Sequence, residues 1–157
     1  MRKYKYIYPP NAREQEQLDI MVEMEAADKD PMAEENVDQE IQPTLFRTQY
    51  WYVSHNRYPR PGSELSFLIV AAGPVYKVEE ISSEMWLDLQ QIWQRLIKEY
   101  KVKGGGICMR FGDPAKSGAS LTRLHAHIIM PTDGEKVRFP IGGRAKLKEG
   151  LAIKGRE

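Results

Sequence analysis

Two closely spaced histidines carry the clearest chemical signal in this sequence. His125 and His127 are separated by one residue, and side chains alternate between the two faces of a β-strand. On a strand, both imidazoles and Arg123 would therefore share one face. A neutral imidazole is a nucleophile near neutral pH. The pattern suits attack on phosphorus, with the second ring nitrogen of His125 bound to a backbone carbonyl so that the attacking lone pair points outward.

A turn of small residues comes just before this predicted strand. Ser117, Gly118, Ala119 and Ser120 follow one another, and backbone N–H groups in such a turn can form a concave site for an anion. We expect these N–H groups and the Ser120 hydroxyl to contact phosphate oxygens.

Two other roles compete for the histidine pair. Both imidazoles could be satisfied within a core, or they could bind zinc together with His55. The chain has three histidines in all and few carboxylates close to the pair in sequence, which favours catalysis over a metal site. The predicted chemistry requires no bound metal, although Mg²⁺ could accompany a polyphosphate substrate.

The elements that must position these residues follow from the apolar pattern. Strands are predicted over residues 46–53, 65–72, 107–110 and 121–130, and the second is apolar enough to be central. A long helix with a 3.6-residue apolar period is predicted from Ser82 or Ser83 to about Tyr100. Residues 111–120 are predicted to be a loop. The order indicates an α+β class with an antiparallel sheet.

The two ends of the chain differ in charge from its middle. Residues 11–42 hold 11 of the 22 acidic residues, whereas the seven basic residues of 136–157 face only two acidic ones. We expect a strand or clamping arm over residues 2–8, a helix over 12–27 capped by Asn11, and an acidic linker over 28–42. The chain thus divides into an arm with linker (1–43), a catalytic domain (44–135) and a basic tail (136–157).

The composition excludes several classes of protein. The 157 residues are 41% hydrophobic and 29% charged, with a net charge of +1, as in ordinary soluble domains. No apolar run is long enough to span a membrane, and the N-terminus lacks the apolar core of a signal peptide. The single cysteine, Cys108, excludes an intramolecular disulfide, so a cytoplasmic location is expected.

The segment GASLTRLHAHIIMP, residues 118–131, resembles the signature of the histidine triad (HIT) superfamily. That signature is His-φ-His-φ-His-φ-φ, preceded five residues earlier by a glycine. Counted from Gly118, its first histidine falls on Arg123, its nucleophilic histidine on His125 and its third on His127. The serine that contacts phosphate falls on Ser120.

Further positions follow from the same resemblance. HNRYPRPG, residues 55–62, is similar to the turn after the family's ribose-binding strand, which puts Asn56 at the ribose. Arg110 falls near an Asn or Gln that touches the α-phosphate. Asn56 could instead cap a turn, and Arg110 could be solvated. Arg123 and Ser66 stand where histidines are common, and an arginine facing the site could clamp phosphate oxygens as a fixed cation.

The resemblance implies a HIT-like antiparallel sheet with a long helix packed on it, plus an N-terminal helical arm. It implies a homodimer and nucleotidyl transfer in two steps, nearest to hydrolases and phosphorylases of diadenosine polyphosphates. His125 would attack the α-phosphorus of an adenine nucleotide, while His127 holds the phosphate or protonates the departing group. Two alternatives stay open: a catalytically weak nucleotide-binding regulatory module, and a nucleic-acid-associated protein that uses the basic tail.

Overall fold

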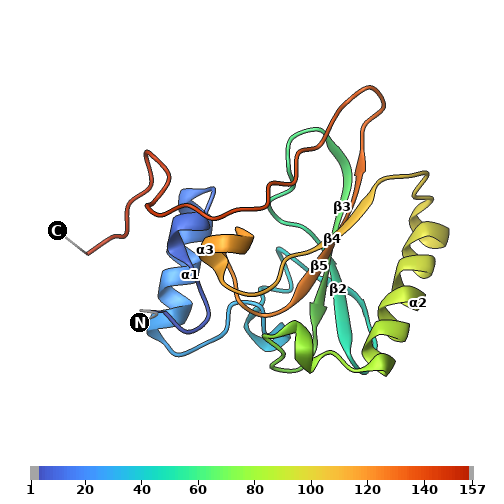
Figure 1. Cartoon of the computed structure of the whole chain (residues 1–157), viewed down its shortest axis with the longest axis horizontal. Helices are drawn as coiled ribbons and strands as arrows, with labels where there is room; N and C mark the ends of the chain where they lie inside the picture. The colour runs from blue at the N-terminus through green and yellow to red at the C-terminus, as the bar shows by residue number, and fades with distance from the viewer. Residues whose placement is uncertain (1–3, 156–157) are drawn as a thin grey trace.

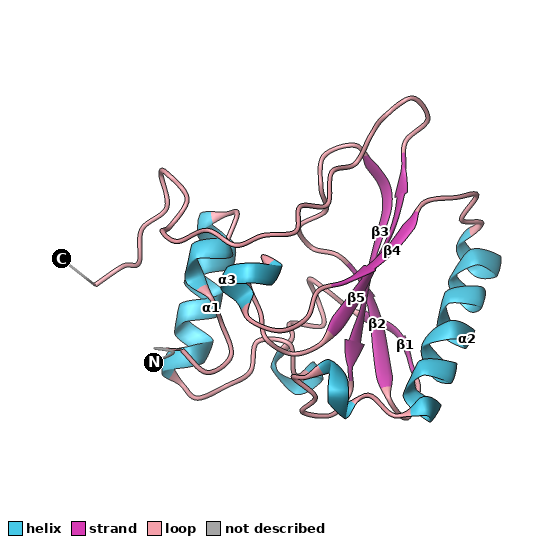
Figure 2. Ribbon diagram, in the orientation of Figure 1, coloured by secondary structure: helices cyan, strands magenta, loops and turns pink. Residues whose placement is uncertain are grey.

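The centre of the molecule is a five-stranded antiparallel sheet. A computed structural model describes residues 4–155 of the chain. The strands lie in the order β1-β2-β3-β5-β4 (Figure 2). The predicted α+β class is confirmed, and the apolar third strand is central, as predicted. The bounds of the strands are β1 Thr44–Arg47, β2 Trp51–His55, β3 Ser63–Ala71, β4 Gly106–Met109 and β5 His125–Pro131.

Helices lie on both sides of this sheet. The long helix α2 covers one face, while α1 and α3 lie on the other side (Figure 1). The Ser82 hydroxyl caps α2 by accepting a hydrogen bond from the backbone N–H of Met85 at 3.2 Å. The helical elements are η1 Pro9–Asn11, α1 Gln15–Ala26, η2 Glu34–Asn36, η3 Val78–Glu80, α2 Ser83–Tyr100 and α3 Pro114–Ser117. Within residues 4–155, no helix is long and apolar enough to cross a membrane.

Strand alternation decides which residues face the core and which face the site. The main core lies between α2 and the sheet, where Phe67, Ala126 and Ile128 are buried against helix residues such as Leu89. Their neighbours along the strands point to the opposite side of the sheet. His125 and His127 are among these neighbours, so they face away from α2, toward α1.

The structure corrects three predicted boundaries. The strand predicted over 46–53 is two strands, because the Thr48 hydroxyl accepts the backbone N–H of Trp51 at 3.1 Å and turns the chain. The strand predicted over 121–130 begins only at His125, because Leu121 bridges to Ile7 of the arm instead. The loop predicted over 111–120 contains the short helix α3.

The N-terminal arm packs closely against the rest of the molecule. Residues 2 and 3 of the predicted arm strand lie outside the described residues, and Ile7 is buried. Asn11 does not cap α1, which begins at Gln15. Its buried side-chain amide instead donates to the backbone carbonyls of Pro114 and Ala119, at 2.9 and 2.8 Å. The arm is thereby tied to the turn that precedes β5.

The basic tail runs along α1 (Figure 1). Gln15 exchanges two hydrogen bonds with the backbone of Ala152, at 2.8 and 3.0 Å. Lys148 donates to the carbonyl of Arg13 at 3.1 Å, and Lys154 forms an ion pair with Asp19 at 2.8 Å. The two ends of the chain therefore pack on each other.

Candidate active site

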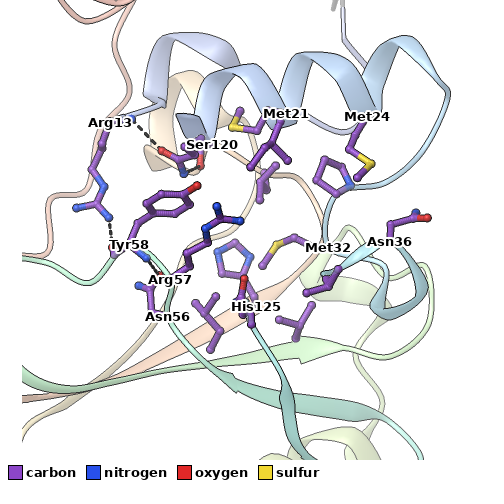
Figure 3. A pocket seen from close by; sticks show the side chains of 18 of the residues that line it. Arg13, Met21, Met24, Met32, Asn36, Asn56, Arg57, Tyr58, Ser120 and His125 are labelled. Carbon is purple, nitrogen blue, oxygen red and sulfur yellow. Dashed lines mark hydrogen bonds between the residues drawn. The ribbon is translucent and has the colours of Figure 1, made fainter. Parts of the chain in front are cut away.

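A cavity of about 370 Å³ lies between the sheet and the N-terminal arm. Its walls come from α1, the segment 31–42 and the face of the sheet opposite α2 (Figure 3). A volume of this size fits a ligand of nucleotide dimensions. Six of the seven site residues predicted from the sequence line it: Asn56, Arg110, Gly118, Ser120, His125 and His127.

His125 has the geometry of an oriented nucleophile. Its Nδ1 lies 2.8 Å from the backbone carbonyl oxygen of Arg123. Because a carbonyl only accepts hydrogen bonds, Nδ1 carries the proton and Nε2 keeps its lone pair. The ring lies at the cavity, 5.1 Å from the ring of His127 between centroids. This is the arrangement expected from the sequence.

Burial and nearby cations keep both imidazoles neutral. Burial lowers the pKa of His125, and the positive charge of Arg110 lowers it further. The hydrogen bond to the Arg123 carbonyl acts in the opposite direction but has a smaller influence than burial. Burial also lowers the pKa of His127 well below its usual range, aided by His125 and Arg110. Near pH 7 the pair therefore offers a nucleophilic nitrogen and a neutral hydrogen-bond donor.

The turn before β5 has a shape that requires glycine. Gly118 has φ +84°, and a Cβ at this position would lie 2.5 Å from the carbonyl oxygen of Gly142 in the tail. Ser120 lies beyond this close contact, and its Oγ is 3.4 Å from the side-chain nitrogen of Gln17 on α1. The turn is thus held between tail and arm, and it presents Gly118 and Ser120 to the cavity.

Asn56 caps a turn and also lines the cavity. Its Oδ1 accepts the backbone N–H of Tyr58 at 2.9 Å, which stabilises the turn after β2. The residue also lines the cavity, and its side-chain nitrogen donates to no group within residues 4–155. That nitrogen is available to a ligand.

Arg110 faces the cavity but is also bound to the tail. Its guanidinium donates to the carbonyl of Pro140 and lies 4.1 Å from the ring centroid of Phe139. The Phe139 ring also contacts His127, at 4.8 Å between centroids. Phe139 therefore joins the tail to the histidine pair, and nothing in the local sequence around it indicates this.

Arg123 does not occupy the place predicted for it. Because β5 begins at His125, the Arg123 side chain turns away from the cavity, and its Nε donates to Asp30 at 2.8 Å. It also donates to the carbonyl oxygens of Ala71, Ala72 and Gly73. The prediction that Arg123 clamps a phosphate is therefore wrong. Its side chain forms a buried structural ion pair, and its backbone carbonyl orients His125.

The other candidate positions lie outside the cavity. His55 stacks on Phe67 at 4.9 Å and contacts Tyr100 of α2, so it is on the opposite face of the sheet from the histidine pair. A zinc site that joins His55 to that pair is therefore excluded. Ser66 is buried, and its hydroxyl has no hydrogen-bond partner among the residues that the structure describes. Residues 4–155 contain no cluster of three His, Cys, Asp or Glu side chains that could hold a metal ion.

The cavity has an apolar end that the sequence reading missed. Figure 3 shows Met21 and Met24 of α1 above His125, with Met32 of the following segment beside its ring. Leu68 and Val70 of β3 form the floor. The modest apolar stripe of α1 was the available signal, but the sequence did not show that it faces the same cavity as β3.

Comparisons with known proteins identify the fold. No protein-family model matches the sequence, and no curated protein matches it. Several solved structures do match. A histidine triad nucleotide-binding protein from Candida albicans is 19% identical, with 69% of this chain and 79% of that chain covered and a TM-score of 0.54.

Two bacterial structures agree with this result. A Zn-bound histidine triad family protein from Mycobacterium smegmatis is 14% identical over 67% of this chain and 74% of that chain, with a TM-score of 0.52. A HIT family hydrolase from Clostridium thermocellum is 16% identical over 60% and 84%, with a TM-score of 0.51. The chain therefore has the fold of histidine triad proteins, and the resemblance of its motif is confirmed at the level of fold.

Proposed function

We propose that the protein is a nucleotidyl hydrolase or transferase that cleaves the α-phosphate linkage of an adenine nucleotide. The observation that carries this proposal is the hydrogen bond from His125 Nδ1 to the Arg123 carbonyl, which directs a neutral Nε2 at a cavity of nucleotide size. Structures with the same fold include one named as a hydrolase and one named as nucleotide-binding. A diadenosine polyphosphate is the substrate that we would test first.

The reaction takes place in two displacements at the same phosphorus. His125 Nε2 attacks the α-phosphorus, a P–N bond forms, and the bond to the departing phosphate oxygen breaks with its electron pair. Water or inorganic phosphate then attacks the phosphorus, and the P–N bond breaks to regenerate the imidazole. The N–H groups of Gly118 and Ala119 already donate to the Pro114 carbonyl and the Ser117 hydroxyl. The Ser120 backbone N–H and hydroxyl therefore stabilise negative charge on the phosphoryl oxygens.

His127 contributes a hydrogen bond rather than a positive charge. Because the pKa of its imidazole is well below the usual range, the ring is neutral near pH 7. It holds a phosphate oxygen or the departing oxygen through N–H donation. The proton that the departing group finally gains comes through this ring or from water.

The order of the strands orients the ligand. Asn56 follows β2 and Leu68 lies on β3, whereas the histidines lie on β5 and Arg110 follows β4. The base and ribose therefore lie over β2 and β3, with the ribose near Asn56. The phosphates extend across β5 toward the β4 edge.

The test is to trap the covalent intermediate. Diadenosine tetraphosphate labelled at its α-phosphate is mixed with wild-type protein, His125→Ala and His55→Ala, with and without inorganic phosphate. Acid-labile label and nucleotide release with wild type and His55→Ala, both lost with His125→Ala, would support the proposal. Nucleotide binding without label or turnover would replace it with a regulatory binding module.

A homodimer is also proposed, and the outer side of α2 supports it. Trp86, Trp93 and Ile97 form an apolar stripe on this helix, with exposed fractions of 46%, 38% and 44%. Such a stripe favours a protein partner. Light scattering should give twice the monomer mass, and Trp93→Glu should reduce it to the monomer value. A monomeric wild type would refute this part.

A further inference from the structure

Three half-buried arginines converge on the cavity beside the histidine pair. Arg13 comes from the arm, Arg60 from the turn after β2, and Arg110 from the end of β4; all three line the cavity. The guanidinium carbons of Arg60 and Arg110 lie 5.0 and 4.1 Å from the centroid of the same ring, that of Phe139. These residues are 97 positions apart at the extremes, so only the fold brings them together.

These three guanidinium groups form no ion pair with a carboxylate in the described part of the chain, residues 4–155. Arg13 and Arg110 donate to the backbone carbonyls of Tyr58 and Pro140, whereas Arg60 donates to no group in the same range. Half-buried like charges repel one another, so this arrangement costs free energy in the unliganded protein.

The pKa of Arg60 reflects this cost. Burial is the main cause and the charges of Arg13, Arg110 and Arg144 add to it, and together they lower the pKa of Arg60 to about 10. Burial also lowers the pKa values of Arg13 and Arg110. At neutral pH all three side chains remain charged. A bound anion would relieve both the repulsion and the missing hydrogen bonds.

We propose that these three arginines form a second anion subsite, which binds the phosphate groups beyond the one that His125 attacks. The inference rests on the proposed function for the position of the first phosphate, which the turn at Gly118 and Ser120 holds. His127 lies between the two subsites, because its ring contacts that of Phe139. The ligand class is a nucleotide with a chain of several phosphates. A nucleoside with a single phosphate would leave the arginines without a partner.

Inorganic anions test the subsite without any need for turnover. Calorimetry compares orthophosphate with tripolyphosphate on the full-length wild type, Arg60→Gln, Arg60→Lys and the control Arg95→Gln, which lies on α2 and pairs with Glu99. Arg60→Gln should weaken tripolyphosphate binding on the order of tenfold and orthophosphate binding much less. Arg60→Lys should restore part of the loss, and Arg95→Gln should match the wild type.

Thermal unfolding separates this loss from misfolding. Arg60→Gln removes a repelled charge without removing a hydrogen bond, so its unfolding temperature without ligand should equal or exceed that of the wild type. A variant that is stable but binds tripolyphosphate less tightly supports the subsite. Equal binding of tripolyphosphate by wild type and Arg60→Gln would overturn it.

Failure of the proposed function would look different. If no label is trapped on His125 but tripolyphosphate binding still depends on Arg60, the subsite stands and the enzyme does not. If labelling by diadenosine tetraphosphate is as efficient in Arg60→Gln as in wild type, with binding unchanged, the enzyme stands and the subsite falls.

Discussion

Replacing Asp30 with alanine should remove much of the stability of the protein, because it leaves a buried guanidinium without its carboxylate. Both Asp30 and Arg123 have side chains that are 6% exposed, and Nε lies 2.8 Å from Oδ2. The same carboxylate accepts the Tyr76 hydroxyl at 2.7 Å and the backbone N–H of Met32 at 2.9 Å. One substitution thus breaks an ion pair and two further hydrogen bonds.

The expected magnitude follows from the burial of the pair. Removing one partner of a buried ion pair costs about 3–5 kcal/mol, whereas domains of this kind are stable by about 5–15 kcal/mol. Asp30→Ala should therefore lose a large fraction of the free energy of unfolding. The double variant Asp30→Ala/Arg123→Met contains neither charge. Its loss in the free energy of unfolding should be smaller, by about 1–3 kcal/mol, than the sum of the losses of the two single variants.

Urea unfolding followed by tryptophan fluorescence measures these free energies. The matched control is Asp19→Ala, which removes a solvent-screened ion pair with Lys154 and should change the free energy of unfolding far less. A loss below about 1 kcal/mol for Asp30→Ala, or strict additivity in the double variant, would refute the view that this buried pair makes a large contribution to stability.

Four further predictions concern pH and small substitutions. Burial lowers the pKa values of both His125 and His127 from 6.5, so below pH 6.5 the unfolded state binds more protons and the free energy of unfolding should fall as pH drops. Labelling of His125 should persist to a lower pH than 6.5, because its folded imidazole stays neutral there; rapid-quench labelling at each pH would show this, and loss already at pH 7 would contradict it. Gly118→Ala should abolish labelling and lower the free energy of unfolding, measured in urea, more than Gly134→Ala does. Both glycines have φ +84°, but only a Cβ at position 118 would meet a backbone oxygen. Equal effects of the two substitutions would count against a tight turn. Ser66→Ala removes a buried hydroxyl without a hydrogen-bond partner among the described residues, so its unfolding temperature should be unchanged or higher, and a large decrease would show a missed hydrogen bond.

The sequence predicted those features that depend on neighbouring residues. Helix α2 was predictable because its apolar period and the Ser82 cap are both local signals. The shared face of His125 and His127 followed from strand alternation alone. The hydrogen bond from His125 to a carbonyl was expected in kind, although the sequence did not show which carbonyl accepts it.

Other features depend on contacts between distant segments, so the sequence did not reveal them. Arg123 points away from the histidines because its side chain binds Asp30. Asp30 is 93 residues away in the sequence, so strand alternation alone placed Arg123 wrongly beside the histidines. The sequence shows Arg60 only as one residue of the HNRYPRPG turn. Its closeness to Arg110 is seen only in the fold, where both guanidinium groups lie over the ring of Phe139. The break at Thr48 had a local signal, a hydroxyl able to bind its own backbone, which the aromatic content of the segment obscured.

Two separate parts of the chain form the cavity, so its apolar wall can change in sequence independently of the histidine pair. His125 and His127 lie on β5, whereas the methionines of the apolar end belong to α1 and the segment after it. Substitutions in the arm can therefore reshape the apolar wall of the cavity while both imidazoles stay in place. A set of chimaeras that share β1 to β5 but carry different arms would show whether ligand choice can change without changing the chemistry proposed for His125.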